Sequence, residues 1–308
     1  MTRYRINRRT CLSLAFSSLL VLSFVSAAFL QQPPIRPAVE IQSNPQLDVP
    51  FVPTSEKVME AMLALAAIQK NDVIYDPACG DGRFVIAAAK QYGVRGVGID
   101  IDPARIEQSR RNAAEANVTR LVKFIQQDMF EADLREATVV MIYLLPNINL
   151  KLRPKLLSEL EPGSRIVSHA FDMGDWAPDK SVEVGNANVF YWVVPANTSG
   201  EWKCKGPTGT AWRDFTVKVS QQFQNIHGTV TCNGMAYTIK NARLNGGALS
   251  FIIDGDKGEP MIFRGNIHKN KLEGTLEKGN GKNTWTGERD PSTRVPIEST
   301  VLKAKMER

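Results

Sequence analysis

The chain has 308 residues, enough for one large domain or two ordinary ones. Its 43% hydrophobic and 23% charged residues are globular values, and they exclude a disordered tail, a collagen-like fibre and a multi-span membrane protein. The net charge of +6 is unevenly spread, with +5 in residues 1–39, −5 in residues 40–196 and +6 in residues 197–308. Because no dense run of lysine and arginine appears, we expect no nucleic-acid partner.

The N-terminus has the pattern of a targeting segment. Four arginines precede an uncharged run from Cys11 to Leu30 that is rich in leucine, phenylalanine, valine and serine. This order predicts that residues 1–30 are either a cleavable signal peptide or an uncleaved membrane anchor. Either would leave the rest of the chain outside the cytoplasm, exported to the periplasm or beyond, or anchored to the membrane. Residues 31–50 contain five prolines and are predicted to form an extended tether.

Between residues 51 and 196 the chain alternates predicted strands and helices. The strands are expected at 73–76, 96–100, 122–126, 139–143 and 165–168, with helices at 55–65, 82–90, 103–117 and 150–160. This alternation predicts an α/β doubly wound, mostly parallel sheet. In such a sheet ligands bind at the carboxyl ends of the strands, near the switch point.

The predicted strand ends carry the residues of a nucleoside site. Residues 76–82, Asp-Pro-Ala-Cys-Gly-Asp-Gly, place two glycines where the backbone can approach a ligand before a helix begins. Val85 stands where a dinucleotide fingerprint has its third glycine, which disfavours NAD. Asp100 follows the second strand and is suited to ribose hydroxyls. Asp128, with Met129 beside it, follows the third strand and is suited to an adenine amino group.

These motifs resemble those of the class I S-adenosylmethionine-dependent methyltransferases, over about residues 50–195. Segments 51–53, 80–90, 143–146 and 175–179 are similar to the small lysine methyltransferases related to the mitochondrial ATP synthase c-subunit enzyme. The resemblance implies S-adenosylmethionine as the cofactor, and we predict no metal site. It implies that the cofactor is held by Asp76, Ala78, Gly80, Asp81, Gly82, Asp100, Ile101, Asp128 and Met129. Ala78 departs from the family pattern, since many members have glycine there.

The implied reaction is methyl transfer to a lysine amine of a protein substrate. A lysine has a pKa of about 10.4 in water and must lose its proton to react. Burial beside a sulfonium cation disfavours the ammonium form. The candidates for orienting the amine at the mouth of the site are Tyr143, Asp172, Asp175 and Trp176. His169, at a strand end, is open to two interpretations, a base or a hydrogen-bonded structural residue. The alternative function is an exported, non-catalytic nucleoside- or ligand-binding protein with a methyltransferase-like fold.

From residue 197 to residue 308 the hydrophobic period changes to two. Strands are predicted at 215–219, 228–231, 237–240, 248–253, 261–264 and 272–276, between turns rich in glycine and asparagine. Seven or eight such strands predict a smaller all-β domain, an antiparallel barrel or sandwich. Its partner is unknown: docking of the substrate, binding of a small molecule and contact with an anionic surface all stay open. Cys204 and Cys232 form either a disulfide or two separate buried thiols.

Overall fold

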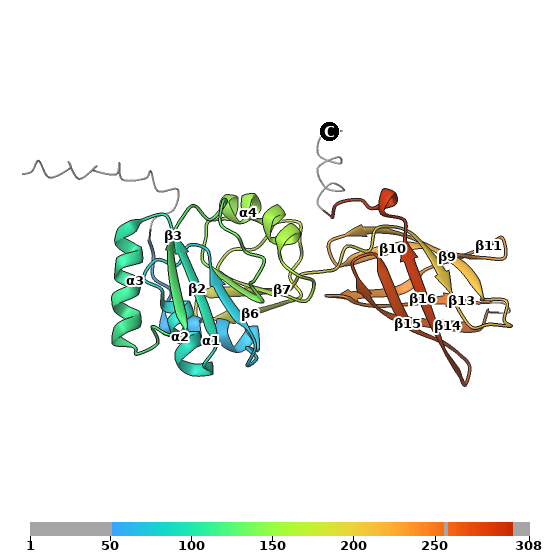
Figure 1. Cartoon of the computed structure of the whole chain (residues 1–308), viewed down its shortest axis with the longest axis horizontal. Coiled ribbons are helices and arrows are strands. Elements are labelled where there is room, and N and C mark those ends of the chain that lie inside the picture. Colours follow the sequence, from blue (N-terminus) through green and yellow to red (C-terminus); the bar gives the residue numbers. More distant parts are fainter. Residues whose placement is uncertain (1–50, 256–257, 298–308) are drawn as a thin grey trace, which may run out of the picture. The chain divides into compact units, whose positions relative to one another are not determined.

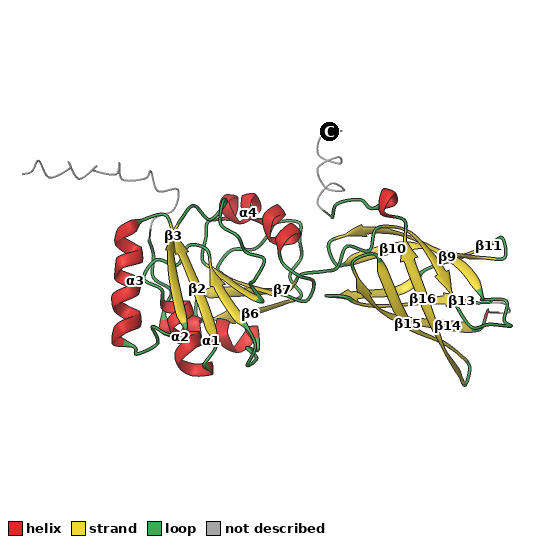
Figure 2. Ribbon diagram, in the orientation of Figure 1, coloured by secondary structure: helices red, strands yellow, loops and turns green. Residues whose placement is uncertain are grey.

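The computed structural model describes residues 51–255 and 258–297 (Figure 1). The predicted signal or anchor and the tether, residues 1–50, lie outside these described residues. Within the described part, no helix is long and apolar enough to span a bilayer. The chain forms a seven-stranded sheet and then a nine-stranded sheet. Figure 2 shows that the α-helices accompany the first sheet.

The first sheet and its helices follow the predicted alternation. The strands are β1 Val73–Asp76, β2 Arg95–Asp100, β3 Val122–Gln126, β4 Val139–Ile142, β5 Arg165–His169, β6 Lys180–Val184 and β7 Ala187–Val193. The helices are α1 Glu56–Ala66, α2 Arg83–Tyr92, α3 Pro103–Glu115 and α4 Pro146–Glu159. Helix α3 begins as its sequence predicts, because the Asp102 side chain accepts a hydrogen bond from the Ala104 amide and proline occupies the first turn.

The strand order β3-β2-β1-β4-β5-β7-β6 creates the switch point between β1 and β4. Strands β1 to β5 are parallel, which confirms the predicted doubly wound sheet. Strands β6 and β7 were not predicted. They form an antiparallel hairpin that pairs with β5 at the sheet edge. The carboxyl ends of β1, β2 and β4 therefore meet around one switch point, where a ligand site is expected.

A buried ion pair lies at the amino end of this sheet. Arg165 on β5 pairs with Asp72, the residue before β1. Burial alone would raise the pKa of Asp72, but hydrogen bonds from the Gln69 amide and from the Arg165 and Thr138 side chains lower it below the usual aspartate range. The pair therefore joins two strands that are far apart in sequence.

Helix α1 ends on a non-glycine residue in the left-handed region. Ala67 has φ 48°, and its amide donates to the Ala64 carbonyl. An alanine in this conformation costs about 1 kcal/mol that a glycine does not. We expect Ala67→Gly to raise the free energy of unfolding by about 1 kcal/mol, measured by chemical denaturation.

The matched control for that change is Ala116→Gly at the end of α3. Ala116 has φ −77°, so glycine relieves no strain there. It is expected to leave stability unchanged or to lower it by about 0.5–1 kcal/mol. An equal gain at both positions would contradict the conformational explanation.

The second sheet is a meander in which the first strand also pairs with the last. Its strands are β8 Gly200–Lys205, β9 Asp214–Gln222, β10 Asn225–Cys232, β11 Met235–Thr238, β12 Lys240–Asn245, β13 Ala248–Asp254, β14 Pro260–His268, β15 Lys271–Lys278 and β16 Gly281–Arg289. The order β11-β10-β9-β8-β16-β15-β14-β13-β12 makes a nearly closed barrel of nine strands, one more than the largest number predicted. Its last described element is the short 3-10 helix Pro291–Thr293.

Aromatic side chains fill the inside of the barrel-like domain. Trp202, Phe215, Phe251, Phe263 and Trp285 are all buried in one cluster. Cys204 and Cys232 belong to the same cluster, and Cys204 is a free thiol, so the alternative of a disulfide between the two is wrong. Burial raises the pKa of Cys204 to about 12, which keeps this thiol protonated and unreactive.

Candidate functional site

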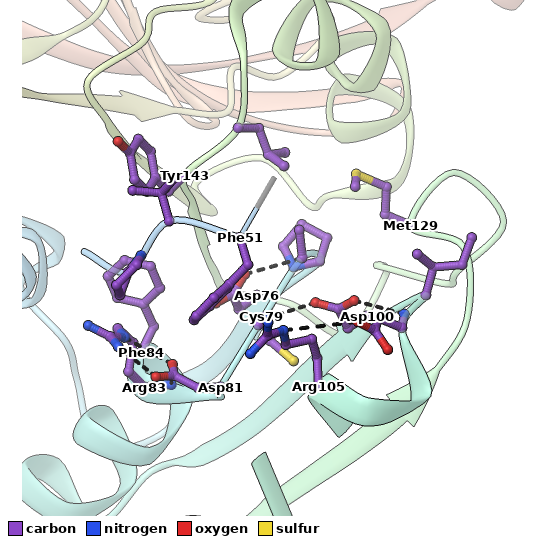
Figure 3. Close-up of a pocket in the computed structure, with 18 of the residues that line it drawn as sticks. Phe51, Asp76, Cys79, Asp81, Arg83, Phe84, Asp100, Arg105, Met129 and Tyr143 are labelled. Atoms are coloured by element: carbon purple, nitrogen blue, oxygen red, sulfur yellow. Dashed lines mark hydrogen bonds and ion pairs between the residues drawn. The ribbon is translucent and has the colours of Figure 1, made fainter. Parts of the chain in front are cut away.

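A cavity of about 280 Å³ opens at the carboxyl ends of β1, β2 and β4 (Figure 3). Loops that follow these strands form most of its wall, and the segment before α1 completes it. The lining residues are Phe51–Thr54, Asp76–Asp81, Arg83, Phe84, Asp100–Asp102, Arg105, Asp128–Phe130, Tyr143 and Leu144. The cavity thus lies at the predicted switch point.

Asp100 organises the glycine turn at one end of the cavity. Its Oδ2 accepts a hydrogen bond from the Gly80 amide at 2.8 Å, and its Oδ1 accepts one from the Asp102 amide at 2.9 Å. Burial raises the pKa of Asp100, and these hydrogen bonds partly oppose the shift. Each carboxylate oxygen can accept a second hydrogen bond, so Asp100 still has acceptor capacity for a ligand hydroxyl.

Asp76 is a buried carboxyl at the end of β1. Its side chain is 2% exposed, and Oδ1 accepts from the Ala78 amide at 3.2 Å. Burial raises the pKa of Asp76 well above its usual value, and the nearby carboxylates Asp100 and Asp81 raise it further. A cationic ligand in the cavity would favour the ionised form of this group.

The Phe51 ring covers the glycine turn. A Cβ added to Gly80, which has φ 53°, would lie 2.3 Å from this ring. The Arg105 guanidinium lies over the same ring, 4.1 Å from its centroid. In Figure 3, Asp100 and Met129 lie on one side of Phe51, and Tyr143 and Arg83 lie on the other. Phe51 is 39% exposed, so it can move when a ligand enters.

The cavity suits a nucleoside that carries a positive charge. Three groups line the same cavity: the glycine turn at Gly80, Asp100 at the end of β2, and Asp128 after β3. The residues present therefore fit S-adenosylmethionine, whose ribose needs acceptors and whose sulfonium is cationic.

Comparison with known proteins gives the same assignment. Residues 76–180 match the family model described as the ANTKMT methyltransferase domain. The chain is 42% identical over 146 residues to a protein-lysine N-methyltransferase of Saccharolobus islandicus, covering 47% of this chain and 91% of that protein. The chain belongs to this methyltransferase family. It is thus an S-adenosylmethionine-dependent methyltransferase, and the non-catalytic alternative gains no support.

Two further relatives cover a similar part of the methyltransferase. The human lysine N-methyltransferase of the ATP synthase c-subunit is 32% identical over 150 residues, which is 49% of this chain and 63% of that protein. A solved structure described as an RNA methyltransferase from Salinibacter ruber, in complex with S-adenosyl-L-homocysteine, is 53% identical. The match covers 46% of this chain and 94% of the chain in that structure, with a TM-score of 0.46.

The structure brings most of the predicted cofactor residues of the methyltransferase to the cavity. Those that line it are Asp76, Ala78, Gly80, Asp81, Asp100, Ile101, Asp128 and Met129. Gly82 does not line the cavity, so its contact with the cofactor stays a prediction. Gly82 is the buried N-cap residue of α2 and has φ 79°. A Cβ at this position would lie 2.7 Å from the Phe124 ring and 3.0 Å from the Ser109 Cβ. Gly82 therefore serves the packing of α2 and α3 rather than the cavity wall.

Of the four acceptor candidates, the structure places only Tyr143 in the cavity wall. Trp176 is fully buried, and its ring stacks on Phe223 with centroids 5.6 Å apart. Asp175 is engaged by Arg153, whose Nη1 lies 2.5 Å from its Oδ1. Asp172 is exposed and accepts from the Gly174 amide. None of these three residues lines the cavity; they shape the loop after β5, and their part in the acceptor entry stays a prediction.

Several residues that line the cavity were not among the predicted site residues. Thr54, Arg83 and Arg105 come from three different segments and meet only in the folded chain. Arg83 donates from Nε and Nη2 to Asp81, at 2.9 and 2.6 Å, and from Nη1 to the Thr54 carbonyl. Only the motif that includes Phe51 pointed to the segment before α1.

The two glycines of the turn offer a matched pair of variants. Gly80→Ala would direct a methyl group into the cavity against the partly exposed Phe51 ring. We expect it to raise the dissociation constant for S-adenosylmethionine by about tenfold or more, which corresponds to about 1.4 kcal/mol. Gly82→Ala would instead press on buried side chains and is expected to lower the free energy of unfolding by about 1–3 kcal/mol. Calorimetric titration and chemical denaturation separate the two effects, and a larger binding loss for Gly82→Ala would contradict the assignment.

Proposed function

We propose that this methyltransferase transfers the methyl group of S-adenosylmethionine to a lysine side chain of a protein. The names of the archaeal and human relatives support a lysine acceptor. The observation that carries the proposal is the charge of the cavity. Five aspartates and only two arginines line it: Asp76, Asp81, Asp100, Asp102 and Asp128, with Arg83 and Arg105.

An excess of carboxylates favours a cationic acceptor. A lysine approaches as an ammonium ion and is attracted by this field, whereas an RNA phosphodiester is repelled by it. Each arginine pairs with one of these aspartates, Arg83 with Asp81 and Arg105 with Asp102, so the excess of acidic groups is carried by Asp76, Asp100 and Asp128. The charge at the cavity therefore supports a protein acceptor over a nucleic acid.

The acceptor end of the cavity has apolar walls. Tyr143 and Leu144 line it, and Phe171 stacks on Tyr143 with ring centroids 6.3 Å apart. Such walls exclude water from the ammonium and lower its pKa, which helps it to lose a proton before it attacks. S-adenosylmethionine supplies, when bound, a methyl group already activated by its sulfonium. The residues of the chain then have to align the amine and keep water out.

The test is methyl transfer from radiolabelled S-adenosylmethionine to a panel of proteins, lysine-containing peptides and RNA. We expect the label in protein, and acid hydrolysis is expected to release it as methyllysine. The Asp100→Ala variant serves as the negative control. Label only in RNA, or in another amino acid, would overturn the proposal.

We also propose that residues 1–30 direct the chain to a membrane, for export or as an anchor. The arginines followed by an uncharged apolar run support this. Fractionation of cells that make the full chain, beside a variant lacking residues 1–30, tests it. Equal recovery of both proteins in the cytosol would contradict it.

A further inference from the structure

His169 lies at the end of β5, directly beside the acceptor wall. Ile142 on β4 pairs in register with Ser168 on β5, so the next residues, Tyr143 and His169, are neighbours. The centroids of their rings are 3.9 Å apart with an interplanar angle of 37°. The imidazole is 8% exposed and does not line the cavity itself. The imidazole therefore packs against Tyr143 without forming part of the cavity wall.

The same imidazole is hydrogen-bonded to segment 51–54, which lies at the cofactor end of the cavity. His169 Nδ1 and Thr54 Oγ1 are hydrogen-bonded at 2.9 Å, and Thr54 is 2% exposed. The Thr54 carbonyl also accepts from Arg83. Thr54 is thus the fixed point of segment 51–54, whose other end places Phe51 over Gly80. One imidazole therefore contacts both the wall of the acceptor end and the cover of the cofactor end.

The chain after His169 adopts an unfavourable conformation that keeps this arrangement. Ala170 has φ 65°, in the left-handed region that is unfavourable for a residue with a Cβ. The turn returns Phe171 to Tyr143, and its amide donates to the His169 carbonyl at 2.8 Å. The buried Asn149 side chain of α4 donates to the Phe171 carbonyl at 3.2 Å. Strain of this kind persists only where the surrounding contacts determine the geometry.

The neutral state of the imidazole also suits its position. Burial lowers the pKa of His169, so the ring is neutral at neutral pH. A neutral ring adds no positive charge beside a cationic cofactor and an incoming ammonium. Of the two interpretations from sequence, a hydrogen-bonded residue agrees with this geometry better than a base does.

We propose that His169 is a positioning residue that joins the two ends of the cavity. Its Nδ1 holds Thr54, and through it segment 51–54 over the cofactor. Its ring face holds Tyr143 at the acceptor end. The acceptor half of this inference rests on the proposed function, whereas the cofactor half does not.

Three variants separate the two contacts. Thr54→Val keeps the shape of the threonine but removes the hydrogen bond. His169→Asn keeps a polar atom near the position of Nδ1 but removes the ring face. The double variant Thr54→Val/His169→Phe keeps a ring against Tyr143 and leaves no unpaired hydroxyl in the interior.

The variants are expected to divide binding from turnover. Thr54→Val and the double variant should each raise the dissociation constant for S-adenosylmethionine about fivefold, the equivalent of one hydrogen bond of about 1 kcal/mol. Their kcat at saturating cofactor should stay within about twofold of the parent. His169→Asn should leave that dissociation constant within about twofold and lower kcat at least about tenfold, because Tyr143 loses its support.

A structural role alone would not produce this division. Thr275→Val is the matched control for the loss of a hydroxyl, because Thr275 lies on β15 and does not line the cavity. Melting temperatures are recorded for every variant. If all three variants change both constants in equal proportion, or change only the melting temperature, the proposal is overturned. If the parent proves to methylate RNA, the proposed function fails, and the same division measured with RNA still decides the role of His169.

Discussion

Asp100→Ala is expected to raise the dissociation constant for S-adenosylmethionine by about 5- to 150-fold, which corresponds to about 1–3 kcal/mol. The carboxylate is the acceptor at the end of β2, and we expect its removal to leave the ribose hydroxyls without a partner. It also releases the Gly80 and Asp102 amides, so the glycine turn loses part of its preformed shape. Isothermal titration of the purified chain measures the effect without any acceptor.

Asp128→Ala is expected to weaken binding within the same range of about 1–3 kcal/mol, since Asp128 also lines the cavity, after the neighbouring strand β3. Asp133→Ala is the matched control, because Asp133 is exposed, pairs with Arg135 and does not line the cavity. Parent-like affinity in both Asp100→Ala and Asp128→Ala would show that the cofactor binds elsewhere. A similar loss in Asp133→Ala would point to a general effect of charge.

Arg165→Met is expected to lower the free energy of unfolding by about 3–5 kcal/mol, because it leaves the Asp72 carboxylate buried without its charged partner. Asp72 is 7% exposed, and Arg165 also donates to the Ala66 and Ala67 carbonyls. The double variant Asp72→Leu/Arg165→Met removes both charges and should recover part of the loss. Urea denaturation at neutral pH measures all three proteins.

The same pair gives a prediction for pH. The pKa of Asp72 is lower in the folded chain than in the unfolded chain, so the pair stabilises fully above the unfolded value of about 4. That stability is lost as the pH falls through the lower, folded value. The parent should therefore lose stability more steeply below about pH 4 than the double variant does. Parallel pH profiles would contradict this role of Asp72.

The sequence predicted the parallel strands well because each is a short apolar run followed by a turn residue. Strand β1 was predicted with its bounds unchanged, and β2 within one residue. The hairpin of β6 and β7 was missed. Four of the five β6 residues are exposed, but Val182 and Val184 alternate with polar residues, and residues 187–193 form a run rich in aromatic and β-branched side chains. A signal was present in Gly185-Asn186, a two-residue turn between runs that pair Val184 with Ala187.

The cofactor end of the site was predictable and the acceptor end was not. Asp76, Asp100 and Asp128 follow strands, and a parallel sheet brings strand ends together whatever the side chains do elsewhere. Thr54 and His169 are 115 residues apart in sequence, and their hydrogen bond depends on how α1 packs on the sheet. Trp176 and Asp175 occur in a recognisable motif, but the motif does not reveal that Arg153 and Phe223 engage them.

The tryptophans decide which optical signals the protein can give. All five, Trp176, Trp192, Trp202, Trp212 and Trp285, are buried, and none lines the cavity. Two lie with the first sheet and three with the barrel-like domain. Intrinsic fluorescence should therefore shift to the red when either sheet unfolds and change little when cofactor is added. Replacing Trp176 and Trp192 together by phenylalanine would leave only the three tryptophans of the barrel-like domain to emit, and replacing those three would leave only the two of the first sheet. The order in which the two sheets lose their structure can then be followed by fluorescence.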